Sequence, residues 1–258
     1  MNTTTTRRAW VVGGSIVAAL ALVFGVFQVV NVLARERTTE VQAFPASGVR
    51  LLDVSSPNGT VEVLGGDVDE ITVTARISHG LRRTSHRAAV EGNVVRVRSS
   101  CPVLSTWCGV EYRITVPGDV AVAADVSNGR LIVRDVAGGV RADATNGAVE
   151  LARLSGDLDV STDNGRVEST GLRSDRVVAR TANGRVRLEF SESPTAVEAR
   201  SANGRVDVVL PNTTDAYRVD LDTDNGSTDA GVRTDPSSGR SVVARTNNGD
   251  VTVRYATG

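Results

Sequence analysis

The 258-residue chain contains no lysine, because all 29 of its basic residues are arginine. A protein without lysine cannot form a lysine Schiff base, use a lysine general base or hold a phosphate with the lysine of a phosphate-binding loop. The net charge of −1 also gives no basic surface of the kind that nucleic acid requires. We therefore expect no nucleic-acid partner and no lysine-dependent chemistry.

Aromatic residues are scarce too, with four Phe, three Tyr and two Trp. A core of Val, Leu, Ile and Ala must be narrow, since a wide core needs large side chains to reach the packing density of protein interiors. This composition is typical of a thin, extended fold.

Cysteine and histidine are limited to two residues each. Cys101 and Cys108 bracket the short stretch PVLSTW, and we predict a local disulfide between them, which suits an oxidising compartment. A metal site is the alternative, but no third or fourth ligand lies nearby in the sequence. His79 and His86 flank the polar stretch GLRRTS and are expected on a surface loop. We predict neither a metal site nor a cofactor.

An uncharged apolar run covers residues 9–34, which exceeds the ~20 residues needed to cross a bilayer. We predict a transmembrane anchor there, with 1–8 as a cytoplasmic tail and 35–43 as a linker. Arg7 and Arg8 precede the run, so the positive-inside rule places the bulk of this single-pass protein outside the cytoplasm. Cleavage after the VLA sequence at 32–34, or a twin-arginine signal in TRRAWVV, are the alternatives.

A repeated turn dominates the rest of the chain. Asn-Gly pairs recur at spacings of 18, 18, 19, 20, 22 and 23 residues, and an earlier pair at Asn58 has similar flanks. The segments before and after each pair alternate between apolar and polar residues, which indicates strands with one buried face. The regular pairs are Asn128, Gly129, Asn146, Gly147, Asn164, Gly165, Asn183, Gly184, Asn203, Gly204, Asn225, Gly226, Asn248 and Gly249.

Two architectures compete for this pattern. In a hairpin meander, Asn-Gly would form a tight reversal because both residues tolerate positive φ. In a β-solenoid, each unit of 18–23 residues is one coil laid on the preceding one, and stacked Asn side chains form a ladder. Residue types recur in phase, with Thr or Ser before and Val after most pairs, which favours the solenoid. We predict an all-β fold, with regular solenoid coils over 118–258 and a less regular β region over 44–117.

The repeated S/T-x-N-G-x-V-x-V motif follows a VEYRITVP segment and one membrane anchor. This arrangement resembles the bacterial putative-adhesin family of β-strand-repeat proteins, a family of unknown function. The resemblance covers about residues 45–256. It implies a β-solenoid or roll, a location in the cell envelope and no established enzyme activity, and it brings no set of binding residues.

The surface offers one feature for binding, a row of arginines two residues after the corner Asn. It consists of Arg130, Arg166, Arg185 and Arg205, with Arg180, Arg200 and Arg245 three residues before the Asn. Neighbouring Asp and Glu can neutralise these arginines, or the row can bind acidic envelope polymers. Carboxylates near the turns, such as Asp163 and Asp224, are too widely spaced along the coils to form a catalytic pair.

We therefore expect a non-catalytic, membrane-anchored extracytoplasmic protein that acts as an adhesin-like or structural interaction module at the cell envelope. Its expected partners are the membrane and either anionic envelope polymers or another envelope protein. An envelope-stress signalling accessory and a β-helix enzyme acting on polysaccharides are the alternatives. The sequence leaves self-association open.

Overall fold

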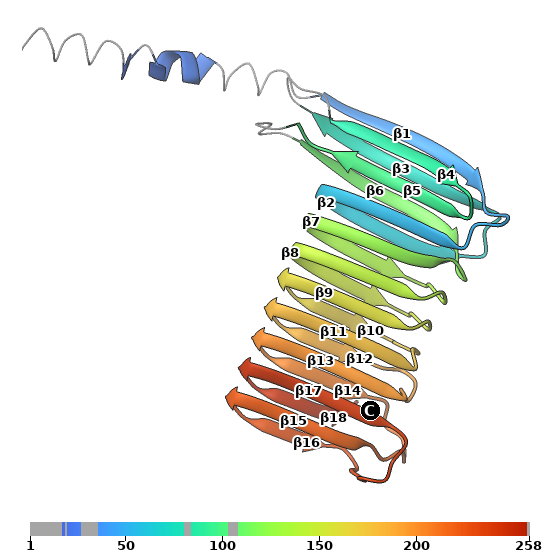
Figure 1. Cartoon of the computed structure of the whole chain (residues 1–258), viewed down its shortest axis with the longest axis vertical. Coiled ribbons are helices and arrows are strands. Elements are labelled where there is room, and N and C mark those ends of the chain that lie inside the picture. The colour runs from blue at the N-terminus through green and yellow to red at the C-terminus, as the bar shows by residue number, and fades with distance from the viewer. Residues whose placement is uncertain (1–16, 19, 27–35, 80–83, 103–107, 257–258) are drawn as a thin grey trace, which may run out of the picture.

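The computed structural model describes residues 17–18, 20–26, 36–79, 84–102 and 108–256, and its body is a rod of β-strands (Figure 1). Residues 17–18 and 20–26 are helical. Within the described part of the chain, no helix is long and apolar enough to cross a membrane, so the predicted transmembrane helix gains no support there. The predicted tail at 1–8 and most of the predicted anchor at 9–34 lie outside the described residues.

The regular part of the rod is built from coils that run past one corner, which we call the Asn-Gly corner. Equal positions of neighbouring coils pair in parallel, so that Asn146 aligns with Asn128 on one side and with Asn164 on the other. This register confirms the predicted solenoid and excludes the hairpin meander, whose strands would pair antiparallel. The strands are β7 (Ala121–Arg134), β8 (Val140–Ala152), β9 (Leu158–Asn164), β10 (Val167–Thr170), β11 (Arg176–Asn183), β12 (Val186–Glu189), β13 (Ala196–Asn203), β14 (Val206–Leu210), β15 (Arg218–Asn225), β16 (Thr228–Gly231), β17 (Ser241–Asn248) and β18 (Val251–Tyr255).

The interior of the rod is a column of aliphatic side chains. Val149, Val167, Val186 and Val206 pair in register from coil to coil, and all four are fully buried. Each coil supplies only a few such side chains, so its apolar face is closed by its neighbours rather than by itself. The thin interior accounts for the small number of aromatic residues.

The Asn side chains of the corner form one hydrogen-bonded ladder. Asn183 Nδ2 donates to Asn164 Oδ1 at 2.9 Å, while Asn183 Oδ1 accepts from Asn203 Nδ2 at 3.0 Å. A second row reinforces the ladder, since hydroxyls such as that of Thr181 donate to a glycine carbonyl of the next coil, here Gly165 O at 3.1 Å. The ladder runs in the spatial order Asn58, Asn128, Asn146, Asn164, Asn183, Asn203, Asn248 and Asn225.

The glycine of each pair is required by the close approach of the coils. A Cβ on Gly204 would lie within 3.0 Å of Gly184 O, closer than real Cβ atoms come, and the φ of Gly204 is +150°. Among the described non-glycine residues, only Asp135 and Arg153 have positive φ. The corner Asn residues therefore lack the positive φ that a hairpin reversal would give them, and their side chains form the ladder that we predicted for the solenoid.

The proximal end of the rod is closed by antiparallel strands (Figure 1, upper end of the rod). β2 pairs in parallel with β7 along one edge and with β5 and β6 along the other. β4 then pairs with β5, β3 with β6 and β1 with β3, all antiparallel. These strands are β1 (Glu36–Pro45), β2 (Leu51–Gly66), β3 (Glu70–His79), β4 (Ser85–Glu91), β5 (Val94–Ser100) and β6 (Cys108–Pro117).

A disulfide between Cys101 and Cys108 takes the place of the Asn-Gly corner between β5 and β6. The two Cα atoms are 5.6 Å apart. Asn58 Nδ2 lies 3.3 Å from Cys101 Sγ, so the Asn ladder ends on the disulfide. The predicted cysteine pair thus joins β5 to β6, which together form the layer on the proximal side of β2.

At the other end, which we call the distal end, the coils do not follow chain order. β13 pairs with β17, and β17 pairs in turn with β15. The last coil of the chain (β17 and β18) therefore lies between the coil of β13 and β14 and the coil of β15 and β16 (Figure 1). The expectation that each coil lies on the preceding one is wrong for these two coils.

The inward-facing residues explain this exchange. The inserted coil has Val251 and Val253 at the inward positions of β18, where the other coil has Thr228 and Ala230 in β16. Placing the more apolar coil inside the rod removes more apolar surface from water than chain order would. The more polar coil is left at the end.

Candidate functional site

The arginine column consists of Arg130, Arg166, Arg185 and Arg205, each two residues after a corner Asn. Each side chain is directed outward because the next residue in its strand, such as Val167 after Arg166, is buried inside the rod. Arg166, Arg185 and Arg205 belong to three consecutive coils, so they follow one another at the ~4.8 Å spacing of parallel strands. Ala148 separates Arg130 from these three.

Three of the four arginines have an acidic neighbour. Arg130 Nε lies 3.4 Å from Glu150 Oε1, and Arg166 Nε lies 3.2 Å from Glu168 Oε2. Arg205 Nη2 lies 3.0 Å from Asp250 Oδ2.

Arg185 has no carboxylate within 4.0 Å among the described residues. The side chains of Arg130, Arg166 and Arg205 are 51%, 48% and 53% exposed, and exposed pairs contribute only about 0–1 kcal/mol each. Another anion can therefore replace the present partners at little cost in stability.

Asp250 ends the arginine column on its distal side. The hydroxyl of Ser227 donates to Asp250 Oδ1 at 2.8 Å, and the Ser227 N–H donates to the same oxygen at 3.1 Å. These two hydrogen bonds, together with the one from Arg205, hold the pKa of Asp250 below its ordinary value. The carboxylate is thus ionised at neutral pH and limits the positive stretch to the coils before it.

A second row of arginines lies on the other side of the corner, three residues before the Asn. Arg180 Nη2 lies 2.7 Å from Glu198 Oε1, and Arg200 Nη1 lies 3.4 Å from the same oxygen. Arg245 pairs with Asp220 of the neighbouring coil. We call the two rows together the arginine corner, a ridge of exposed and mostly paired arginines on both sides of the Asn ladder.

The carboxylates of the rod do not converge on a catalytic centre in the described part of the chain. Asp163 and Asp224 share the same position of the repeat, but the coils of β11, β13 and β17 lie between theirs. Four steps of ~4.8 Å place them about 19 Å apart, too far for paired acid–base work. The described residues also contain no group of three or more His, Cys, Asp or Glu arranged to hold a metal ion.

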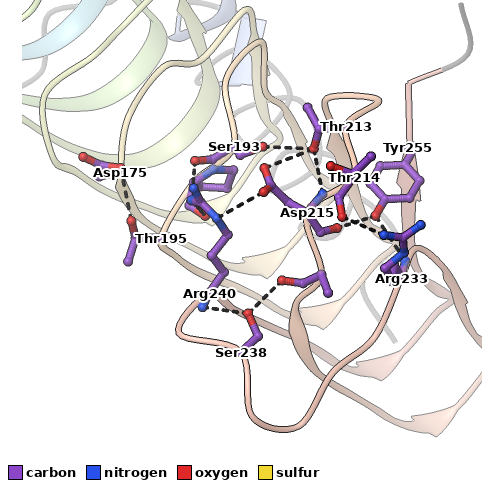
Figure 2. A network of polar contacts seen from close by, with 12 residues as sticks. Asp175, Ser193, Thr195, Thr213, Thr214, Asp215, Arg233, Ser238, Arg240 and Tyr255 are labelled. Atoms are coloured by element: carbon purple, nitrogen blue, oxygen red, sulfur yellow. Dashed lines mark hydrogen bonds and ion pairs between the residues drawn. The ribbon is translucent and has the colours of Figure 1, made fainter.

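A network of loop residues holds the exchanged coils at the distal end (Figure 2). Arg240, just before β17, donates from Nη1 to the carbonyls of Ser193 at 2.8 Å and Pro194 at 3.0 Å, which precede β13. The hydroxyl of Tyr255, at the end of β18, donates to Asp215 O at 2.7 Å. These bonds attach both ends of the last coil to loops of the neighbouring coils and so maintain its place beside β13.

The sequence of the repeat identifies the family to which the chain belongs. Residues 49–257 match Toastrack DUF4097. The chain is a member of the Toastrack DUF4097 family. This membership confirms the resemblance that the repeats indicated, and the Toastrack match covers β2 to β18, whereas β1 precedes it.

Two of the solved structures to which the chain is similar come from bacteria. A putative cell adhesion protein from Clostridium sporogenes ATCC 15579 is 12% identical, with a TM-score of 0.43, over 86% of this chain and all of its own. A putative adhesin from Bacteroides fragilis NCTC 9343 is 15% identical, with a TM-score of 0.47, over 85% of this chain and 97% of its own. No curated protein matches the sequence.

Two features of the Toastrack chain were not expected from its sequence. His86 lies on β4 rather than on a polar loop, and its Nδ1 is 2.9 Å from the Tyr112 hydroxyl. Burial lowers the pKa of His86 and raises that of Tyr112 to about 12. The alternation of exposed and partly buried positions in SHRAAVE could have predicted this strand. The loop network around Arg240 could not be predicted from the sequence, because the acceptors of its two hydrogen bonds are the backbone carbonyls of Ser193 and Pro194.

Proposed function

We propose that this Toastrack protein is a non-catalytic, adhesin-like interaction module, tethered to the cell membrane by residues 9–34 and exposed outside the cytoplasm. The arginine corner is its contact surface, and anionic polymers of the cell envelope are the ligands. The observation that carries this proposal is the row of Arg166, Arg185 and Arg205 on three consecutive coils.

The fold suits a contact surface of this kind. The hydrogen-bonded ladder beside the arginines holds their backbones at a fixed repeat, so a polyanion meets a row of cations that is already ordered. Several weak contacts in one row add up to useful affinity through multivalency. Arg185, without a carboxylate within 4.0 Å in the described part of the chain, offers a first contact that displaces no internal partner.

The position of the chain ends is consistent with a tether. β1 begins at Glu36, two residues after the last residue of the apolar run, and lies at the proximal end of the rod (Figure 1). A membrane attachment at this end directs the regular coils away from the bilayer. The Cys101–Cys108 disulfide fits the oxidising conditions outside the cytoplasm.

Retention of the full-length protein on immobilised polygalacturonate or heparin tests the ligand class. We expect retention at low salt that falls steeply with ionic strength, because exposed charges are screened within about 10 Å at 0.1 M salt. The triple variant Arg166→Ala, Arg185→Ala and Arg205→Ala should elute at clearly lower salt than the wild type.

The matched control changes Arg50, Arg87 and Arg218 to Ala. These arginines are exposed, lie away from the corner and have no ion pair within the described residues, so the net charge changes equally. Unchanged retention of the corner variant, or equal loss in both triple variants, would show that the corner is not a specific contact surface.

A further inference from the structure

The distal end of the rod carries an unpaired sheet edge. Within the described residues, β15 pairs only with β17 and β16 only with β18, and this edge is covered just before β15, where Tyr217 pairs with Thr234. The N–H of Arg218 donates to Arg240 O at 2.8 Å, toward β17. Because backbone groups of a parallel strand point to alternate sides residue by residue, those of Val219 and Leu221 point along the rod axis toward solvent. This edge presents a row of hydrogen-bonding groups on both sides of the corner.

Apolar side chains from the interior of the rod are partly exposed beside the same edge. Val219, Leu221 and Ala230 occupy the inward positions of β15 and β16, yet they are half-buried or exposed because no described coil covers them. They line a cavity of about 500 Å³ with the segment Thr234–Pro236 as one wall. In the neighbouring coil the same positions, Val242, Ala244 and Val253, are fully buried. The end of the rod is thus a hollow that one more strand would cover.

The outward positions of the strands at this edge are acidic. Strands β15 and β16 carry four exposed aspartates and one exposed arginine, Arg218, and of these aspartates Asp220 already pairs with Arg245 of β17. The aspartates are Asp220, Asp222, Asp224 and Asp229. Two distal ends facing each other would bring these carboxylates together, which disfavours a second copy of the chain as the occupant. A strand with cations at its outward positions would match the edge in hydrogen bonding, apolar surface and charge.

We propose that the distal edge binds an extended, cationic segment of another protein, which adds to β15 as one further strand. The bound segment places small apolar residues over Val219 and Leu221 and directs Arg or Lys toward Asp220 and Asp222. Main-chain hydrogen bonds supply affinity in this mode of recognition, and the alternating side chains supply specificity. The arginine corner takes no part.

A peptide that copies the natural neighbour of β15 provides the probe. Strand β17 reads SVVARTNN, and the peptide SVRARTNN adds a second outward cation opposite Asp220. Fluorescence anisotropy with the full-length protein in nonionic detergent measures its affinity, and SVEAETNN is the charge-reversed control. We expect the cationic peptide to bind about tenfold more tightly than the control, since two close charge pairs change sign.

Two variants of the protein test the strand-addition geometry. Val219→Pro removes an N–H that points to solvent, and proline is tolerated at such an edge position, so the native fold is retained. Val219→Ala keeps this N–H and shortens the same side chain. We expect Val219→Pro to weaken peptide binding about tenfold through lost main-chain pairing, and Val219→Ala to weaken it far less.

The Arg166, Arg185 and Arg205 triple variant should bind the peptide like the wild type, which separates this surface from the arginine corner. Equal binding of both peptides, or unchanged binding by Val219→Pro, would overturn the proposal. A dimer of the full chain that Val219→Pro dissociates would also overturn it, because the occupant would then be a second copy.

Discussion

Replacing Gly204 with Ala tests the close approach of the coils most directly. Its φ is +150°, and the added methyl would lie within 3.0 Å of Gly184 O. That oxygen accepts a hydrogen bond from Ser201 Oγ at 3.0 Å. The methyl can be accommodated only if the coils of β11 and β13 separate at the corner.

The cost of this separation follows from the bonds it breaks. Besides the Ser201 bond, the opening strains the Gly184 N–H bond to Asn203 O at 2.9 Å and the Asn203–Asn183 ladder bond at 3.0 Å. Three hydrogen bonds at roughly 1 kcal/mol each give about 3 kcal/mol. The unfavourable φ adds about 1 kcal/mol, so we expect Gly204→Ala to lower the free energy of unfolding by about 3–4 kcal/mol.

Urea unfolding followed by far-ultraviolet circular dichroism measures this loss. Gly239→Ala is the matched control, because nothing lies within 4 Å of its added Cβ. We expect this control to stay within about 0.5 kcal/mol of the wild type. Equal unfolding midpoints for the two variants would refute the conclusion that the corner glycines are fixed by coil spacing.

Two further predictions concern acid stability and covalent ageing. Burial alone would raise the pKa of Glu62, but hydrogen bonds from Arg113 and Arg134 at 3.0 Å and 2.6 Å outweigh it and lower this pKa below its ordinary value of 4.5. The ionised Glu62 therefore adds to the free energy of unfolding above pH 4.5, and this contribution is lost as the pH falls and the carboxylate is protonated. When the free energy of unfolding is measured between about pH 2 and 7, Glu62→Gln should lack this part of the pH dependence. Asn-Gly pairs are prone to deamidation, and Asn225 should react first in the folded protein, because no described acceptor binds the Gly226 N–H while the equivalent Gly184 N–H donates to Asn203 O. Peptide mapping by mass spectrometry at mildly alkaline pH checks this order, and comparable rates at all eight sites in the folded protein, as expected only in denaturant, would contradict it.

The solenoid could be predicted because the register between its coils depends on the same residue type recurring at equivalent positions. Asn183 needs another Asn side chain at the same height, and Val186 another small aliphatic residue, so residues that recur in phase reveal which positions stack. The closure of the proximal end by antiparallel strands could not be read in this way, since β1, β3 and β4 carry no repeat.

The order of the last coils was also beyond the sequence pattern. Every coil has the same corner Asn and the same strand spacing. The repeat pattern by itself is therefore compatible with any two coils being neighbours. The choice depends on small differences in apolar content between β16 and β18 and on the Arg240 bonds to two backbone carbonyls.

The candidate site depends on this order as well. In chain order Arg205 would lie beside Ser227, whereas the exchanged order brings Asp250 against it at 3.0 Å. The arginines themselves were evident from their position in the repeat. Their partners were not, because each partner is decided by which coil lies next.

The exchanged coil has a consequence for how the protein is made. Ribosomes synthesise residues 218–231 before residues 241–255. However, β15 can take its native place only after β17 has paired with β13, because β15 pairs with β17. Docking of β15 and β16 therefore waits until residues 241–255 have been synthesised and have paired with the coil of β13 and β14. A truncation or stalled translocation that removes only residues 241–258 would strip two layers from the molecule instead of one.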